Sequence, residues 1–179
     1  MRILGIDPGS LACGYGLIEG GPSSGTWVCL ASGRIMLPPR EPLHARLSQL
    51  HRNLAEVIER CVPGEVCIER MFFAKGIKAA LNFGHTRGVV LLTASLSGIP
   101  IFEYSALEVK KAVTGYGRAE KSQVMEMVRG ILGIDHALSP DSADALALAL
   151  CHGNRSRWDL PPRASSPPVR KRTAPAVAR

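Results

Sequence analysis

The stretch Ile3-Leu4-Gly5-Ile6-Asp7-Pro8-Gly9-Ser10 is a short run of strand-forming residues that ends in a single carboxylate. The run is apolar on both faces, which is typical of a central strand in an α/β sheet. Pro8 and Gly9 end the strand in a turn, and an Asp at such a place often serves only to start the turn. The stretch therefore predicts a buried strand and leaves open whether Asp7 is structural or chemical.

The order of the segments that follow indicates a mixed sheet. Three strand-forming segments linked by turns continue the first strand, at 15–18, 26–30 and 34–37. A helix opened by Pro42, a strand at 65–68, a helix at about 78–96, a strand at 99–104 and three further helices come next. This order predicts an α/β fold, in which an antiparallel meander and parallel strands form a mixed five-stranded sheet flanked by helices.

Charge is distributed unevenly along the 179 residues. The whole chain carries +7, but residues 154–179 hold seven basic residues and one acidic residue, so they carry +6 and residues 1–153 carry only +1. The last segment also holds five prolines and few bulky apolar residues, which is typical of disordered segments. The sequence predicts a folded domain at 1–153 and a disordered Pro-rich basic tail at 154–179 that attracts phosphate backbones.

Other features of the composition exclude whole classes of protein. The apolar run at 89–92 is far shorter than the ~20 residues of a membrane span. Arg2 is followed by only four largely apolar residues before Asp7, so we expect no signal peptide. The five cysteines show no metal-site spacing and are expected to be core residues in a reducing compartment. We expect a cytoplasmic protein.

Asp7 and Glu69 each close an apolar strand at its C-terminal end. In open α/β sheets this edge is where ligands bind. A second acidic pair lies in the segment 139–150, where Ser139 suits the N-cap of a helix and a proline follows it. Asp141 and Asp144 are three residues apart and share a face at the start of this helix, whose remaining residues are mostly Ala and Leu. We expect the helix to be buried, with its two carboxylates held at one end.

Each of these four acids taken singly is more often structural than catalytic, and Asp141 alone could serve the helix dipole. Four carboxylates placed close together repel one another and need a cation. Carboxylate oxygens without a set of His or Cys residues suit Mg²⁺ or Mn²⁺ rather than zinc. Two such ions can activate a water and stabilise the leaving oxygen of a phosphodiester. The acids together predict a site for metal-dependent phosphodiester chemistry.

Five motifs follow one another along the chain: "GIDPGS" at 5–10 with "GYG" at 14–16, "CIERMFFAKG" at 67–76, "HTRGV" at 85–89, "GRAEKSQV" at 117–124 and "PDSADALALA" at 140–149. In their order and spacing they resemble the motifs of the RuvC family of bacterial Holliday-junction resolvases. The resemblance covers about residues 1–152. It implies a ribonuclease H-like fold and a structure-selective endodeoxyribonuclease that resolves four-way junctions by paired symmetric nicks, in recombination and repair.

The resemblance also implies roles for single residues. Asp7, Glu69, Asp141 and Asp144 match the family's four catalytic acids, which hold two Mg²⁺ or Mn²⁺ ions in each active site. Lys121 matches a lysine associated with the cleavage step, Phe72 an aromatic that stacks on bases, and Lys110 a lysine that contacts DNA. The family further implies a homodimer and the RuvA-RuvB branch-migration complex as a partner. Because the position of Asp141 is Asp or His among relatives, the preferred metal stays open.

Further contacts with DNA are indicated by the residues themselves. Phe72 and Phe73 cannot both point into the core from a strand, so one of them is expected to be exposed for stacking beside Lys75 and Lys78. Around the "TGYG" segment at 114–117, basic residues are expected to contact phosphates. They are Lys110, Lys111, Arg118 and Lys121.

Two other functions remain as hypotheses. "DPGS" at the end of a first strand resembles the phosphate loop of actin-like ATPases and sugar kinases, although 179 residues leave no space for their second phosphate loop and adenosine-binding subdomain. A DNA-binding protein without catalysis, in which the acids serve as caps, predicts that Asp7→Asn leaves every activity intact.

Overall fold

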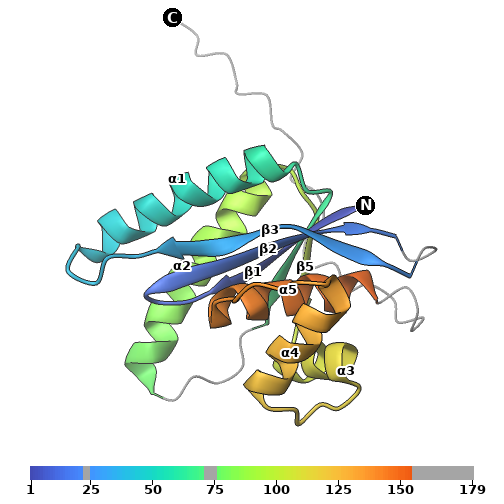
Figure 1. Cartoon of the computed structure of the whole chain (residues 1–179). Coiled ribbons are helices and arrows are strands. Elements are labelled where there is room, and N and C mark those ends of the chain that lie inside the picture. Colours follow the sequence, from blue (N-terminus) through green and yellow to red (C-terminus); the bar gives the residue numbers. More distant parts are fainter. Residues whose placement is uncertain (22–24, 71–75, 155–179) are drawn as a thin grey trace, which may run out of the picture.

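The computed structural model describes residues 1–21, 25–70 and 76–154. Within these ranges the chain forms a five-stranded sheet flanked by five helices (Figure 1). The strands are β1 (Arg2–Pro8), β2 (Ala12–Gly20), β3 (Trp27–Met36), β4 (Glu65–Glu69) and β5 (Ile101–Tyr104). The helices are α1 (Leu43–Cys61), α2 (Ile77–Leu96), α3 (Ala106–Thr114), α4 (Lys121–Leu132) and α5 (Pro140–Gly153). None of these described helices is long and apolar enough to cross a membrane.

The strand order β3-β2-β1-β4-β5 places β1 at the centre of the sheet. β1 is antiparallel to β2, and β2 is antiparallel to β3, whereas β4 and β5 continue the sheet in parallel with β1. Ile3, Leu4 and Ile6 of β1 are completely buried because helices cover both faces of this strand. The predicted mixed five-stranded sheet, with its meander and its parallel strands, is confirmed.

The segments at 26–30 and 34–37 do not form two strands joined by a turn, as the sequence suggested. They belong to one strand, β3, whose pairing with β2 shifts register between Leu17 and Ile18. The small residues between the segments read as a turn, but an edge strand accommodates them as an irregularity in the ladder. Gly33 also lies against the ring of Tyr15, where an added Cβ would come within 2.6 Å of the hydroxyl oxygen.

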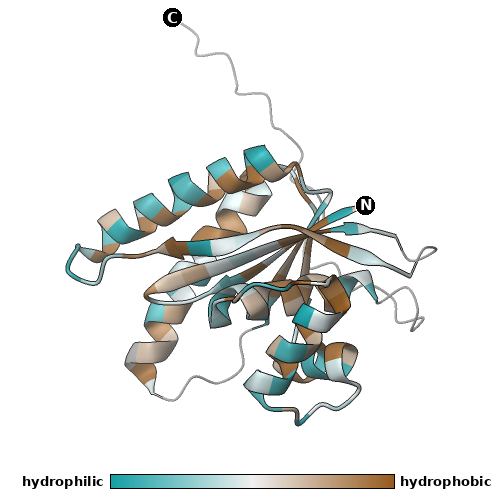
Figure 2. Ribbon diagram, in the orientation of Figure 1, coloured by the Kyte–Doolittle hydropathy of each residue, from teal (hydrophilic) through white to brown (hydrophobic). Residues whose placement is uncertain are grey.

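The helices form one layer on each face of the sheet. In Figure 1, α1 and α2 lie on one face, and α3, α4 and α5 lie on the other. α1 buries Leu50, Leu54 and Ile58 and turns hydrophilic residues to solvent, so its ribbon alternates between the two colours of Figure 2. The molecule therefore has two apolar cores separated by the sheet.

α5 packs unusually close to the sheet because glycines lie beneath it. A Cβ added at Gly5 of β1 would come within 1.9 Å of the Ala145 carbonyl oxygen. One added at Gly14 of β2 would come within 2.1 Å of the Asp141 carbonyl oxygen. The glycines thus let the helix backbone rest directly on the strands. This contact places the first turn of α5 beside the C-terminal end of β1.

Candidate metal centre

Asp7 and Glu69 are brought together by the parallel pairing of β1 and β4. Ile6 pairs with Ile68 in this ladder, so the acidic residue that follows each of them lies at the same edge of the sheet. The turn after Asp7 is tied down by Arg46 of α1, which donates a hydrogen bond to the Ser10 carbonyl oxygen. The two acids that end the strands are therefore neighbours, as the sequence predicted.

The start of α5 is fixed by hydrogen bonds on both sides. The Ser139 side chain caps the helix by accepting a hydrogen bond from the Ser142 N–H, and Pro140 occupies the first turn. The Ser142 hydroxyl in turn donates to the Gly33 carbonyl oxygen of β3 at 3.1 Å. The two carboxylates of this turn, from Asp141 and Asp144, are thus held on the sheet rather than on a free helix end.

Three of the four acids meet in one cavity of about 130 Å³. Asp7, Glu69 and Asp144 line it together with Lys110 of α3 and Lys121 of α4. The remaining walls are apolar and come from α3, α4 and α5, through Ala106, Val109, Val124 and Leu148. Side chains from five different elements therefore converge on a small, partly enclosed space.

The carboxylates of the cavity are not easily ionised together. Burial, followed by the charges of Asp144 and Glu69, raises the pKa of Asp7 from 3.8 to about 7. The pKa of Glu69 is also raised, first by burial and then by the charge of Asp144. Without a compensating cation this arrangement destabilises the folded protein at neutral pH.

Lys121 supplies one positive charge to the cavity. Its ammonium donates a hydrogen bond to Asp144 Oδ2 at 2.8 Å, and this bond is the main reason that the pKa of Lys121 is raised. The lysine side chain is 78% exposed, so water screens the pair and it contributes little to stability. Breaking the ion pair between Lys121 and Asp144 therefore costs little free energy, so Asp144 can exchange the lysine for another cation.

Asp141 lies at the margin of this group. It does not line the cavity, and among the acids that raise the pKa of Asp7 its contribution is the smallest. Its nearest cation is Arg34 of β3, with Nη1 at 3.8 Å from Oδ2. The structure therefore places three acids together and the fourth beside them with an arginine that the sequence analysis did not single out. A lone arginine in a strand gives no signal of such a role.

The donor set fits a hard divalent cation. In the ranges that the structure describes, no three His, Cys, Asp or Glu side chains form a ready-made cage around one point. Three of the carboxylates nevertheless share a cavity and offer oxygen donors only, and the charge of Asp144 raises the pKa of both Asp7 and Glu69, which a bound cation would relieve. Asp144 would have to exchange its lysine for the ion.

The predicted DNA-contacting residues divide into those that the structure describes and those that it does not. Lys110 lines the cavity, and the side chains of Lys111 and Arg118 are exposed on the same α3–α4 segment. Lys78 lies in the first turn of α2, and its side chain is not described. Phe72, Phe73 and Lys75 lie outside the described residues.

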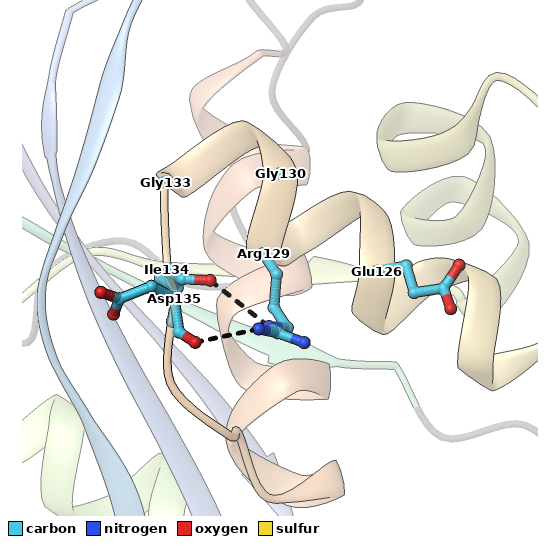
Figure 3. Close-up of a pocket in the computed structure, with 6 residues that line it drawn as sticks. All are labelled: Glu126, Arg129, Gly130, Gly133, Ile134 and Asp135. Carbon is cyan, nitrogen blue, oxygen red and sulfur yellow. Dashed lines mark hydrogen bonds between the residues drawn. The ribbon is translucent and has the colours of Figure 1, made fainter.

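A second hollow lies at the C-terminal end of α4 (Figure 3). It is lined by Glu126, Arg129, Gly130, Gly133, Ile134 and Asp135. The Arg129 guanidinium donates to the backbone carbonyl oxygens of Ile134 and Asp135, at 3.3 and 3.2 Å. These bonds satisfy carbonyl groups just after the helix, so Arg129 has a structural role here. The acidic cavity is therefore the stronger candidate for a functional site.

Comparison with known proteins assigns the chain to a family. The sequence model of crossover junction endodeoxyribonuclease RuvC matches residues 3–152, a range that contains all four acids. The chain belongs to the RuvC family. Members of this family are metal-dependent endodeoxyribonucleases, so the match favours a nuclease over an actin-like ATPase.

Relatives in the RuvC family resemble the chain over most of its length. The RuvC protein of Magnetococcus marinus is 44% identical over 158 residues, which are 88% of this chain and 87% of the relative. That of Moorella thermoacetica is 45% identical over 159 residues, 88% of this chain and 94% of the relative. The match thus extends beyond the motifs to most of the chain.

Solved structures confirm the ribonuclease H-like fold. RuvC of T. thermophilus in complex with a Holliday junction substrate superposes with a TM-score of 0.82 at 36% identity, covering 88% of this chain and 96% of that one. The yeast mitochondrial Holliday junction resolvase Ydc2 is only 14% identical, covers 83% of this chain and 77% of that one, and has a TM-score of 0.58, so it shares the fold alone.

Proposed function

We propose that the chain resolves four-way DNA junctions by paired symmetric nicks in recombination and repair. The observation that carries this proposal is the cavity in which three carboxylates meet two lysines, in a chain that belongs to the RuvC family. The T. thermophilus relative bound to a Holliday junction supports a junction as the substrate. A cytoplasmic location is part of the same proposal.

In this proposal Asp7, Glu69, Asp141 and Asp144 hold two ions of Mg²⁺ or Mn²⁺. When bound, these ions supply an activated water and stabilise the leaving oxygen of the phosphodiester. The raised pKa of Asp7 supports the assignment, because this carboxylate gains most from a nearby positive charge. Asp7 lines the cavity and is also close enough to Asp141 for that charge to raise its pKa, which supports placing all four acids in one metal centre.

Basic residues around the cavity hold the DNA backbone. Lys121 contacts Asp144 in the free protein, and its ammonium becomes available to the reacting phosphate once that carboxylate binds metal. Lys110 reaches the cavity itself, and Lys111 and Arg118 extend the positive surface along α3 and the loop that follows. Contacts by Phe72, Phe73, Lys75 and Lys78 belong to the same proposal.

Paired nicks need two active sites, and α2 offers a surface for a homodimer. Leu81, Gly88, Leu92 and Leu96 follow one another at spacings of seven, four and four residues and are all exposed, which gives α2 an apolar stripe facing away from the sheet. A second copy of the chain would bury this stripe and relate the two cavities by a twofold axis. Cooperation with the RuvA-RuvB complex is proposed from the family alone.

The first test is cleavage of a labelled synthetic four-way junction and of a linear duplex of equal length, with Mg²⁺, Mn²⁺ or EDTA. We expect paired symmetric nicks in the junction only, lost with EDTA and reduced to background in Asp7→Asn. Asp135→Asn removes an exposed acid that does not line the cavity and serves as the matched control. Binding without cutting in either metal would favour the non-catalytic DNA-binding protein instead.

The dimer is tested separately by Leu92→Glu. This change places a charge on the exposed stripe of α2, so we expect a monomer in light scattering that remains folded and no longer makes paired nicks. Leu43→Glu alters an exposed leucine at the start of α1 and should leave the dimer intact. An unchanged mass in Leu92→Glu would show that the copies associate elsewhere.

A further inference from the structure

Each carboxylate at the start of α5 is paired with a cation from a different element. Asp144 contacts Lys121 of α4 at 2.8 Å, and Asp141 faces Arg34 of β3 at 3.8 Å. Asp141 and Asp144 are both proposed metal ligands, and in the metal-free protein each of them already contacts a positively charged side chain. The lysine follows from the family resemblance, whereas the arginine has been given no role so far.

The position of Arg34 is fixed by the backbone around it. Arg34 pairs with Gly14 of β2, and at this glycine the backbone of Asp141 rests directly on the strand. The residue before it, Gly33, accepts the hydrogen bond from the Ser142 hydroxyl. These contacts hold β3 and α5 together next to the Arg34–Asp141 pair. The guanidinium therefore lies beside this carboxylate because of the backbone contacts around it.

The pair is also easy to separate. The side chain of Arg34 is 46% exposed and that of Asp141 is 34% exposed, so water screens their attraction and the ion pair contributes little to stability. A guanidinium remains charged throughout the range in which proteins are stable. It therefore opposes a second cation at Asp141, and neither residue of the pair lines the cavity.

We propose that Arg34 is a positioning residue that holds Asp141 in the metal-free protein and competes with the metal ion for this carboxylate. Its presence lowers the affinity for metal at the outer position, and metal binding releases the guanidinium toward solvent, where a DNA phosphate can accept from it. This inference rests on the proposed function, in which Asp141 is a metal ligand.

The test is calorimetric titration of the full-length protein with Mn²⁺ and with Mg²⁺, without DNA. We expect Arg34→Met to bind metal about 2–10-fold more tightly than the unaltered protein, because one competing charge has been removed. Arg40→Met, which removes an exposed arginine beyond the end of β3, should change the affinity less than twofold. Equal or weaker binding by Arg34→Met would overturn the inference.

A double-mutant cycle separates a direct contact from a general effect of charge. In an Asp141→Asn background, Arg34→Met should no longer tighten metal binding, since the shared carboxylate is absent. If the full gain persists, Arg34 does not act through Asp141 and the inference is wrong. Arg34→Gln, which stays polar in the exposed strand, should repeat the gain seen with Arg34→Met.

Failure of the proposed function gives a different result. If Asp7→Asn and Asp141→Asn bind metal as tightly as the unaltered protein, the acids are not the ligands, and the inference about Arg34 falls with that assignment. If those variants lose metal but Arg34→Met titrates like the unaltered protein, only the role of Arg34 is refuted.

Discussion

α1 and α5 cover opposite faces of the same sheet in different ways. Five of the 19 residues of α1 are buried, and its outer face is polar. Eleven of the 14 residues of α5 are buried, because the sheet lies beneath it and α3 and α4 lie above it. α1 lies on the surface of the protein, whereas α5 lies inside it. Asp141 and Asp144, in the first turns of α5, are among the few residues of this helix that are not buried. The helix that carries two of the proposed metal ligands is thus more completely buried than α1.

The difference has a simple origin in side-chain size. α1 contacts the sheet through leucines and other long side chains, which keep the two backbones apart. α5 is rich in alanine and rests on glycines of β1 and β2, so its backbone touches the strands. Positions defined by backbone contact change less than positions defined by rotamers. The positions of Asp141 and Asp144 are therefore defined by the contact of the α5 backbone with β1 and β2.

The largest effect is expected at the glycine contact. Gly5→Ala should destabilise the protein by about 3 kcal/mol or more, because the new Cβ would overlap the Ala145 carbonyl oxygen and force α5 off the sheet. Gly64→Ala, just after α1, is the matched change, since its Cβ would meet only the Arg2 carbonyl oxygen at an ordinary 3.6 Å. Denaturant unfolding measures both. Similar losses would mean that α5 is no more tightly seated than the α1 region.

The next effect compares leucines in the two helices. Leu146→Ala in α5 and Leu54→Ala in α1 each remove a completely buried side chain, so each should cost about 2–5 kcal/mol. Only Leu146→Ala should also weaken metal binding, by several-fold, because it loosens the helix that carries the carboxylates. Denaturant unfolding and calorimetric titration give the two readouts. If both variants kept full metal affinity, α5 would not position the site through its packing.

The smallest effect is the pH dependence that Asp7 imposes. Its pKa is about 7 in the folded protein and near 3.8 when unfolded, so the folded state binds more protons between these values and loses stability as the pH rises. In EDTA, Asp7→Asn should therefore match the unaltered protein at pH 4 and exceed it by about 1–3 kcal/mol at pH 8. Denaturant midpoints across this range measure the difference, with Asp135→Asn as control. Parallel pH profiles would contradict the crowding of carboxylates.

Several features of the fold and site could be predicted from the sequence because their causes are local. Apolar runs marked the central strands, and Ser139-Pro140 marked the start of α5. Asp7 and Glu69 could be placed at one edge because parallel strands end on the same side of a sheet. The roles of the four acids as metal ligands remain predictions, and so does the boundary between the domain and the tail at residue 154.

Other features depend on contacts between distant segments. The small residues at 31–33 favour a turn locally, yet pairing with β2 draws them into one continuous strand. The separation of Asp141 from the cavity also arises only when β3 and α5 meet, since this meeting brings Arg34 to that carboxylate.

The order of the elements, the buried character of β1 and α5, and the family of the chain could all be predicted from short stretches of sequence, because each depends on residues that are close together in the chain. The grouping of the charges, in contrast, depends on how distant segments pack together. Three carboxylates share a cavity with Lys121, and the fourth stands outside with Arg34. Electrostatic energy depends on distances through space, and the chain acquires those distances only when α5 settles onto the glycines of β1 and β2.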